Sequence, residues 1–352
     1  MEEHDVVVVG RGCAGASAAF FTKRLCPERS VLLLDRLDEG KFRKYHRMCG
    51  EAVSEAAFRQ LAPLRPDNVV HDITTVTETW PGGVVMRAKA IGYVLDRPLF
   101  IKGIVNRFVA SGGVSEEDAA VAVEPEASGF VVRLSSGRSV RARFLVGADG
   151  AHSRVRQEVF REAPPVMTWT EQYVVEKDLP KDTIQFIQGE RYKGGYRWEF
   201  PSGRYAKIGF PRGTDRVEEE VVETHRRAIP SGGLSRVVKG RCMLVGDAAA
   251  MPNPLTAGGI RTALLSGRRA AEAIASGELS SFEGWWRGSP FSDPMYLKAL
   301  RQFEGMTDDD YSRASEPFRG GYGALSYVRA RLSLPQYREV YRAYLKSSQY
   351  GW

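Results

Sequence analysis

Near its N-terminus the chain carries the stretch Asp5-Val6-Val7-Val8-Val9-Gly10-Arg11-Gly12-Cys13-Ala14-Gly15, which decides the fold. The four β-branched valines predict a buried strand, because the run is too short and too branched for a helix. The small residues after Gly15 predict a helix, and a second apolar run, residues 31–34, ends at Asp35. Strand, glycine loop, helix, strand and acid in this order are typical of a dinucleotide-binding βαβ unit.

Each residue of the glycine loop has a physical task in such a unit. Gly10 permits the tight turn, Gly12 lets the backbone approach a pyrophosphate, and Gly15 lets helix and strand pack closely. The helix N-terminus then faces the phosphates, and Asp35 accepts a hydrogen bond from a ribose hydroxyl. The alternative is a tight turn that binds no ligand, but the full pattern favours dinucleotide binding.

The bulk composition is that of a globular protein. The 352 residues are 43% hydrophobic and 26% charged, which suffices for a large core and about two domains. The net charge of +7 suits an anionic surface such as phospholipid head groups, or an acidic substrate. We expect no nucleic-acid partner.

The cysteine spacing and the hydropathy of the sequence indicate the cellular compartment in which the protein is expected. Cys13, Cys26, Cys49 and Cys242 are irregularly spaced, so they predict neither a disulfide frame nor a metal site and suit a reducing cytoplasm. No charged-then-apolar leader precedes the first strand, and no apolar run is long enough to span a membrane. We therefore expect a cytoplasmic protein, with any membrane contact peripheral at the inner face.

Two further strand-to-loop elements accompany the first. One is Gly147-Ala148-Asp149-Gly150, and the other is Gly246-Asp247, followed twelve residues later by the helix start Gly258-Gly259-Ile260. Asp247 is expected to bind ribityl or pyrophosphate-linked groups, and the free N–H groups at the helix start to face an electron-rich acceptor. In a flavin enzyme this acceptor is the edge that becomes anionic on reduction. A loop of this kind taken alone is more often a structural turn than a site, but the three together, in this order, indicate a site.

Together these loops resemble the three fingerprints of the para-hydroxybenzoate hydroxylase-type flavoproteins. The resemblance rests on the first glycine motif, on Gly147-Ala148-Asp149-Gly150 with Arg154, and on Gly246-Asp247. It implies a bound FAD. Arg97, at the start of a predicted helix, matches an arginine that this superfamily places near the flavin.

Two other stretches narrow the resemblance to the geranylgeranyl reductase family. Gly195-Tyr196-Arg197-Trp198-Glu199-Phe200-Pro201 is similar to its Tyr-x-Trp-x-Phe-Pro motif, and Met48-Cys49-Gly50 to its Cys-Gly element beside the flavin. Asn253-Pro254-Leu255-Thr256 matches its run after the Gly-Asp motif. Where the family commonly has a further loop glycine, this chain has Ala257. The resemblance implies saturation of isoprenoid double bonds by reduced FAD in a long apolar tunnel.

The resemblance also implies site residues. Tyr196, Trp198 and Phe200 would form the wall of the substrate cavity, and their period-two spacing puts them on one strand face, although such aromatics are more often core. Val121 is assigned from its distance to Arg97 rather than from a motif. The implied cofactor-binding positions are Gly10, Gly12, Ala14, Gly15, Asp35, Cys49, Gly50, Ala52, Arg97, Val121, Asp247, Gly258, Gly259 and Ile260.

The proton donor for such a reduction is left open between water, Cys49 and Tyr196. Cys49 could also be only a small buried hydrophobe. His46 and His152 are expected at the surface or in a supporting position rather than as catalysts.

The predicted architecture is α/β, with a discontinuous domain. Residues 1–68, 96–160 and 236–280 would form a Rossmann-like FAD-binding domain with a mixed sheet. Residues 69–95 and 161–235 would form a smaller antiparallel-sheet substrate domain, and residues 281–352 a helical C-terminal region. In the last of these, Tyr337, Val340, Tyr341, Tyr344 and Leu345 fall on one helical face, and Arg338, Arg342 and Lys346 form a basic stripe. This helix is expected to cap the tunnel and touch anionic lipid head groups, or else to be an ordinary solvated helix.

The predicted function is FAD-dependent reduction of prenyl double bonds in an isoprenoid lipid or diphosphate. The electron donor would be NAD(P)H or a reduced ferredoxin, the latter an electron-donor protein partner. One alternative is an FAD-dependent monooxygenase or halogenase acting on an aromatic or apolar substrate, which would share the fingerprints. Another is a prenyl-binding carrier without flavin chemistry.

Overall fold

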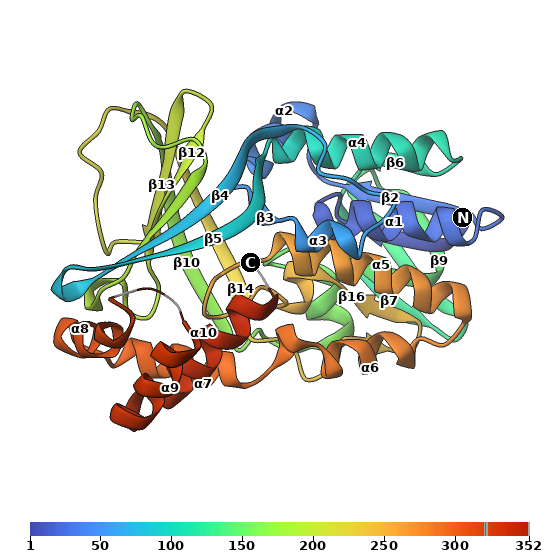
Figure 1. The fold of residues 1–352 in the computed structure, drawn as a ribbon. Coiled ribbons are helices and arrows are strands. Elements are labelled where there is room, and N and C mark those ends of the chain that lie inside the picture. The colour runs from blue at the N-terminus through green and yellow to red at the C-terminus, as the bar shows by residue number, and fades with distance from the viewer. Residues whose placement is uncertain (320, 322, 351–352) are drawn as a thin grey trace.

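The computed structural model describes residues 1–319, 321 and 323–350, and its strands form two eight-stranded sheets (Figure 1). The predicted βαβ unit is present as β1 (Glu2–Val9), α1 (Cys13–Leu25) and β2 (Val31–Asp35). Val6 to Val9 pair in parallel with Val31 to Leu34. These valines and leucines are almost wholly buried, which explains why the strands are continuous apolar runs rather than alternating ones.

The first sheet has the strand order β15-β16-β9-β1-β2-β6, with β8 antiparallel to β9 and β7 to β8, so it is mixed as predicted. Helix α1 packs between α4 and α5. The approach of α5 is close, because a Cβ on Gly267 would lie 2.3 Å from the carbonyl oxygen of Ala14. The remaining elements of this half are α2 (Glu39–His46), α3 (Ala56–Arg59), α4 (Arg97–Ala110), β6 (Val114–Glu117), β7 (Ala120–Glu126), β8 (Gly129–Leu134), β9 (Ser139–Gly147), β15 (Val238–Lys239), β16 (Cys242–Leu244) and α5 (Ile260–Ser276).

The second sheet has the order β14-β10-β13-β12-β11-β4-β5-β3 and departs from the prediction in two respects. It is not purely antiparallel, because β11 pairs in parallel with β4. Strand β3 belongs to it, although the predicted boundary at residue 68 put this strand in the FAD-binding domain. The strands are β3 (Ala52–Ser54), β4 (Val69–Trp80), β5 (Val84–Leu95), β10 (Val166–Val175), β11 (Thr183–Ile187), β12 (Arg197–Ser202), β13 (Tyr205–Pro211) and β14 (Val221–Ser231).

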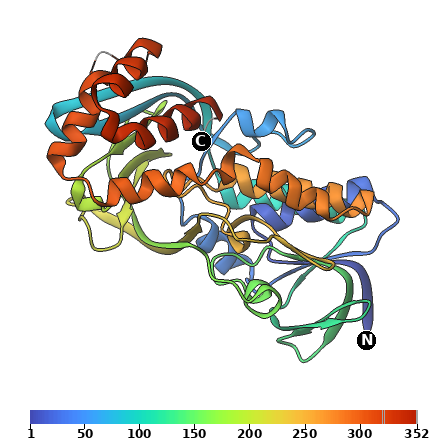
Figure 2. The same ribbon diagram turned by 90° about the horizontal axis from the view of Figure 1, so that it is seen from below.

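The C-terminal region is helical, as predicted. It comprises α6 (Ser280–Gly288), α7 (Met295–Glu304), α8 (Asp308–Ser315), α9 (Ala324–Ser333) and α10 (Arg338–Tyr350). Helices α7 to α10 gather beside the second sheet, at the end of the molecule away from β1 (Figure 2). Phe303 and Tyr311 of these helices stack on one another and pack against Trp80 of β4. Within the described residues, no helix is long and apolar enough to cross a membrane.

The predicted apolar face of the last helix is a packing face. Val340 and Tyr341 are buried in the second hydrophobic core, and Tyr337 is buried in the short turn just before α10. The basic stripe is largely ion-paired: Arg338 and Arg342 contact Glu339, and Lys346 contacts Asp293. The tail helix is therefore an anchor for the C-terminal region rather than a free amphipathic surface.

Candidate active site

One cavity of about 1170 Å³ extends from the glycine loops of the first sheet to the aromatic strand β12 of the second. This volume exceeds the roughly 300–1,000 Å³ of ordinary small-molecule sites. There is thus space for a large cofactor and a long substrate in one continuous chamber. Two walls are defined here by their lining residues. The glycine wall consists of residues 9–14, 35–37, 46, 97, 148–150, 227, 247, 252, 253 and 255–260, and the aromatic wall of residues 170, 172, 186, 196, 198, 200 and 225.

The glycine loop is built so that its backbone approaches its neighbours too closely for a side chain. Gly10 has a φ of +103°, and a Cβ there would lie 2.3 Å from the carbonyl oxygen of Ala148. A Cβ on Gly15 would lie 1.8 Å from the carbonyl oxygen of Gly10. Gly12 is the N-cap of α1 and receives no side-chain cap, so the N–H groups of the first turn are available at the cavity. The lining residue Ala14 follows in the same turn.

Asp35 ends β2 beside this loop and is buried. Its carboxylate accepts hydrogen bonds from the N–H groups of Arg11, at 2.6 Å, and of Leu37, at 2.8 Å. Burial raises the pKa of Asp35, and the two N–H donors oppose this rise. The carboxylate is therefore held in a fixed orientation at the cavity edge, as an acceptor for a ribose hydroxyl requires.

The two other predicted loops meet at the same edge of the first sheet. Asp149 caps its own turn, because its carboxylate accepts from the N–H groups of Arg154, at 2.6 Å, and Val155, at 3.1 Å. Asp247 lies across the cavity and forms an ion pair with Arg227 at 3.3 Å. Asp149 is thus engaged with its own loop, whereas Asp247 has a single charged partner.

The N-terminus of α5 also faces the cavity. Gly259 is its N-cap without a side-chain cap, and Gly258 and Ile260 line the chamber beside it. The preceding residue Ala257 has a φ of +51°, in the left-handed region that favours glycine. This conformation explains why a glycine would suit that position.

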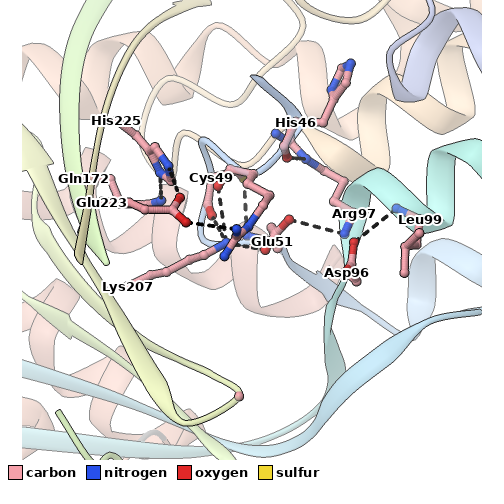
Figure 3. A network of polar contacts seen from close by, with 12 residues as sticks. His46, Cys49, Glu51, Asp96, Arg97, Leu99, Gln172, Lys207, Glu223 and His225 are labelled. Atoms are coloured by element: carbon pink, nitrogen blue, oxygen red, sulfur yellow. Dashed lines mark hydrogen bonds and ion pairs between the residues drawn. The ribbon is translucent and has the colours of Figure 1, made fainter. Parts of the chain in front are cut away.

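The Cys49 loop is held by a buried polar network, which Figure 3 shows. Lys207 of β13, which is fully buried, donates to the carbonyl oxygens of Arg47 (3.2 Å) and Cys49 (3.1 Å) and to the Glu51 carboxylate. Glu51 also accepts from the N–H of Arg97 at 3.2 Å. The Cys49 thiol sulfur accepts from the N–H of Glu51 at 3.3 Å. The loop between the two sheets is therefore fixed from both sides.

Arg97 begins α4, as predicted, and it lies at this loop. Its Nε donates to the carbonyl oxygen of His46 at 2.7 Å, and its Nη2 has no hydrogen-bond partner among the described residues. His46 is itself buried at the cavity, which agrees with the expected supporting position and not with a surface one. Burial, followed by the charges of Arg97 and Arg227, holds the pKa of His46 well below its usual range, so its imidazole is neutral. His152 is exposed at the cavity edge.

The aromatic wall is a row of side chains across four strands. Trp198 on β12 faces Gly209 on β13, and a Cβ on Gly209 would lie 2.0 Å from the indole ring. The ring passes over this glycine to reach β10, where its N–H donates to Gln172 Oε1 at 3.2 Å. The Gln172 amide nitrogen contacts His225 Nδ1 on β14 at 3.1 Å. His225 Nε2 contacts Glu223 at 3.0 Å, and Glu223 pairs with Arg47.

Tyr196 and Phe200 lie on the same face as Trp198, as predicted. Tyr196 and Phe200 both pack edge-on against Phe186 of β11, and the hydroxyl of Tyr196 donates to the carbonyl oxygen of Thr256. A Cβ on Gly50 would lie 2.5 Å from the Phe200 ring. Burial raises the pKa of Tyr196 well above its usual value. The structure thus brings the predicted Cys-Gly loop and the predicted aromatic strand into direct contact.

Two of the predicted positions, Gly15 and Val121, do not line the cavity. Val121 is 44% exposed on β7, whereas the preceding residues Asp118, Ala119 and Ala120 line the chamber. Val121 is assigned from its distance along the chain to Arg97, and such a distance does not determine which residue of a strand faces the cavity. Ala52, by contrast, lines the cavity as expected.

Other lining residues were not predicted: Gln172, His225, Arg227, Arg261, Phe291 and Tyr327. Gln172 of β10 and His225 of β14 are buried polar residues, and a polar residue at an inward-facing strand position is the sequence feature that could have indicated them. The others belong to no motif.

The polar groups of the glycine wall fit an anionic dinucleotide such as FAD. Arg11 Nε, Arg97 Nη2 and Arg227 Nη1 are buried without a hydrogen-bond partner among the described residues. Two uncapped helix N-termini and the fixed Asp35 carboxylate lie at the same wall. Buried donors are normally paired, so this concentration favours a ligand that supplies acceptor oxygens, such as a pyrophosphate and a flavin edge.

Comparison with known proteins agrees with this fold and site. Residues 114–194 match the FAD binding domain family. Digeranylgeranylglycerophospholipid reductase 1 of Methanopyrus kandleri is 33% identical over 311 residues, which cover 77% of this chain and 80% of that protein. Digeranylgeranylglycerophospholipid reductase 2 of the same organism is 30% identical over 370 residues, covering 89% and 90%. A solved structure of a geranylgeranyl bacteriochlorophyll reductase-like protein from Thermoplasma acidophilum has a TM-score of 0.81 at 20% identity, covering 97% of this chain and 99% of that one, and shows the same fold.

The fold, the glycine wall and the matched domain define an FAD-dependent oxidoreductase. The chain belongs to the geranylgeranyl reductase family, since relatives of that kind share about a third of its residues over most of its length. The predicted cofactor and family are thereby confirmed. The roles of the single site residues and the domain boundaries stay predictions.

Proposed function

We propose that this protein saturates carbon–carbon double bonds in the prenyl chains of an isoprenoid lipid or diphosphate. The observation that carries the proposal is the continuity of one cavity, with the glycine wall at one end and an apolar aromatic wall at the other. The names of the two M. kandleri relatives support a prenyl lipid as the substrate class. Bound FAD in its reduced form supplies hydride, so the protein must supply orientation, dryness and a proton.

The aromatic wall supplies orientation and excludes water. Trp198 is fixed by Gln172, and Tyr196 by Thr256, so both rings present rigid apolar faces to the chamber.

Two side chains, Cys49 and Tyr196, could donate the proton that the reduction requires. The hydroxyl of Tyr196 is committed to the Thr256 carbonyl, whereas the Cys49 sulfur accepts from Glu51 and keeps its S–H free to donate. Comparing Cys49→Ala with Tyr196→Phe separates the two, because only the true donor should show a large rate loss with normal flavin content.

The function is tested by anaerobic incubation of dithionite-reduced holoenzyme with prenyl lipids and prenyl diphosphates. The expected product is heavier by two hydrogens for each reduced double bond, and mass spectrometry detects this. Turnover that needs oxygen and inserts oxygen or halide into an aromatic substrate would instead establish the monooxygenase or halogenase alternative. A purified protein without flavin absorbance would establish the carrier.

The electron donor is part of the same proposal and stays open between NAD(P)H and a reduced ferredoxin. The sequence contains no second glycine fingerprint for a resident nicotinamide cofactor. Stopped-flow bleaching of the flavin by NADPH, by NADH and by reduced ferredoxin, each under anaerobic conditions, identifies the donor as the one that reduces it within the turnover time.

The proposal includes peripheral contact with an anionic bilayer, but through α9 rather than through the basic stripe of α10. Leu325, Val328 and Leu332 of α9 are 85%, 56% and 79% exposed. On an α-helix these three side chains fall within an arc of about 60°, flanked on either side by Arg329 and Arg331. Both arginines are exposed, and neither forms an ion pair with a described residue. An apolar stripe between two free arginines is the pattern of a helix that lies in a lipid interface.

Charge and position support a lipid surface as the partner. Residues 319–352 carry six Arg and Lys side chains against one acidic side chain, so most of the net charge of +7 lies here. Tyr327, on the buried side of α9, lines the cavity, as does Gly323 just before the helix. Docking of α9 would therefore bring the chamber next to the membrane that holds a lipid substrate.

Vesicle co-sedimentation tests this contact with a triple variant, Leu325→Ser, Val328→Ser and Leu332→Ser. We expect a loss of binding to phosphatidylglycerol-containing vesicles of about tenfold or more, because the apolar anchor is removed. The matched control is Leu25→Ser, Val109→Ser and Val114→Ser, whose side chains are 46%, 47% and 44% exposed elsewhere on the surface. Equal sedimentation of both triple variants and the parent protein would exclude α9 as the anchor.

A further inference from the structure

The cavity is also lined by a buried arginine that belongs to neither the glycine wall nor the aromatic wall. Arg261 lies in the first turn of α5 and is only 7% exposed, and it lines the chamber together with Arg59 of α3 and Phe291. Its guanidinium lies over the Phe291 ring at 5.0 Å from the centroid. It is thus a cation in a largely apolar position.

This arginine has no anionic partner. Its Nε and Nη1 are buried without a hydrogen-bond partner among the described residues, and none of the carboxylates described lies within ion-pair distance. Burial lowers the pKa of Arg261, and the neighbouring positive charge of Arg59 lowers it further. An arginine nevertheless keeps its charge at neutral pH. Burial and the nearby charge of Arg59 therefore destabilise the charged guanidinium in the folded protein.

Its neighbours on the same helix and in the same cavity differ in this respect. Arg268, two turns further along α5, pairs with Glu272 and donates to the carbonyl oxygen of Gln60. Arg227, at the glycine wall, pairs with Asp247. A buried cation without a counter-ion is costly, and it is compensated when a ligand brings the opposite charge.

We propose that Arg261, with Arg59 beside it, binds the phosphate or diphosphate head of the prenyl substrate. A guanidinium is suited to this, because its planar fork donates two hydrogen bonds to phosphate oxygens. The chain of such a substrate then extends from Arg261 toward Tyr196 of the aromatic wall, whose hydroxyl donates to the Thr256 carbonyl oxygen. The inference rests on the proposed function and adds to it that the substrate carries an anionic head.

The test measures ligand binding to the oxidised holoenzyme, so that it does not depend on turnover. The probes are geranylgeranyl diphosphate, a prenyl glycerophospholipid and the neutral geranylgeraniol, and the variants are Arg261→Gln and Arg261→Lys. For Arg261→Gln we expect Kd to rise about tenfold to a hundredfold for a ligand whose phosphate binds here, with the alcohol unchanged. Arg261→Lys should recover part of the loss, because it restores the charge without the fork.

The two anionic probes distinguish the sources of the phosphate. A loss confined to the diphosphate assigns the site to a free prenyl diphosphate, and a loss confined to the glycerophospholipid assigns it to a lipid head group. Arg268→Gln is the matched control on the same helix face and should leave all three affinities unchanged.

Three binding results would overturn the proposal. The first is an equal loss of affinity for the alcohol and for the anionic probes, which indicates a structural role. The second is a loss of bound FAD in Arg261→Gln with unchanged prenyl-ligand affinity in the loaded fraction, which assigns the side chain to the cofactor. The third is unchanged affinity for all three probes.

If Arg261→Gln does not fold, the same comparison is made with Arg261→Lys and Arg59→Gln. Reduction of a neutral prenyl alcohol by the wild-type protein with no charge discrimination would leave the proposed function intact and refute only the head-group site.

Discussion

The two walls of the cavity are held in place by different means. The glycine wall is fixed by backbone contacts, since at Gly10 and Gly15 any side chain would collide with a carbonyl oxygen. The aromatic wall is fixed by side chains, through the row from Trp198 over Gly209 to Gln172 and His225. A site fixed by backbone contacts tolerates almost no substitution at its few glycine positions. A site fixed by side chains can change shape through substitution of any side chain in the row. This difference suits a constant cofactor at one wall and a flexible prenyl chain at the other.

The two walls meet in the Cys49 loop, and the largest expected effect comes from breaking this joint. Lys207→Met removes the cation that β13 contributes and leaves the Glu51 carboxylate buried without its main partner. Removing one member of a buried pair typically costs about 3–5 kcal/mol. We expect a loss of that size in the free energy of unfolding, measured by urea titration, together with weaker FAD retention, because the loop that carries Cys49 and Gly50 loses its anchor.

The double variant Lys207→Met with Glu51→Gln provides the control. It removes the uncompensated charge as well, so it should regain most of the lost stability. Normal flavin affinity in Lys207→Met despite lower stability would show that the two walls are independent and that the loop is not a joint.

A smaller effect is expected from disturbing the aromatic wall alone. In Gly209→Ala the new methyl group would lie 2.0 Å from the Trp198 ring, so the indole must move and leave Gln172. Overpacking of this kind costs about 1–3 kcal/mol. We expect that loss in urea unfolding, a shifted tryptophan emission and reduced turnover of prenyl substrates, with unchanged flavin content because the glycine wall is untouched.

Gly103→Ala is the matched control for the methyl group. No atom lies within 4 Å of the position that its Cβ would take, and it lies inside α4, where alanine is favoured. It should leave emission and turnover unchanged and stability equal or slightly higher. Loss of flavin from Gly209→Ala would contradict the separation of the two walls.

The different construction of the walls also explains how much the sequence could predict. Gly10, Gly15 and Asp35 are predictable because a tight turn and a fixed acceptor restrict the residue type at a fixed spacing. Tyr196, Trp198 and Phe200 are predictable as one strand face from their alternation. The parallel and antiparallel strands of the first sheet follow from the continuous apolar runs and the short turn at Gly137.

The positions that escaped prediction depend on tertiary contacts. Gln172 and His225 lie far apart in the sequence and become neighbours only through the register of β10 and β14. Lys207 resembles an ordinary surface lysine in an alternating strand, yet the Cys49 loop covers it completely. That Ala120 rather than Val121 lines the cavity, and that β3 pairs with β5 of the second sheet, depend likewise on strand register, which local pattern does not encode.

The smallest expected effect compares one histidine from each wall. Burial lowers the pKa of both His46 and His225 below 6.5, the usual value. At His46 the charges of Arg97 and Arg227 lower it further, whereas at His225 the hydrogen bond to Glu223 opposes the effect of burial. The unfolded chain therefore binds a proton more readily than the folded one at both sites, so stability is constant above about pH 6.5 and falls as the pH drops below it.

Each histidine that stays neutral in the fold contributes a slope of up to about 1.4 kcal/mol per pH unit below its unfolded pKa. Urea unfolding in excess FAD at several pH values measures this slope. Because the folded pKa of His46 is lowered further, the loss at His46 continues to lower pH than the loss at His225. His46→Asn should accordingly remove more of the acid sensitivity than His225→Asn. If the two buried variants reduced the acid-dependent loss of stability equally, the positive charges of Arg97 and Arg227 would not lower the pKa of His46 further. Bound FAD would then compensate those charges, because the measurement is made in excess FAD.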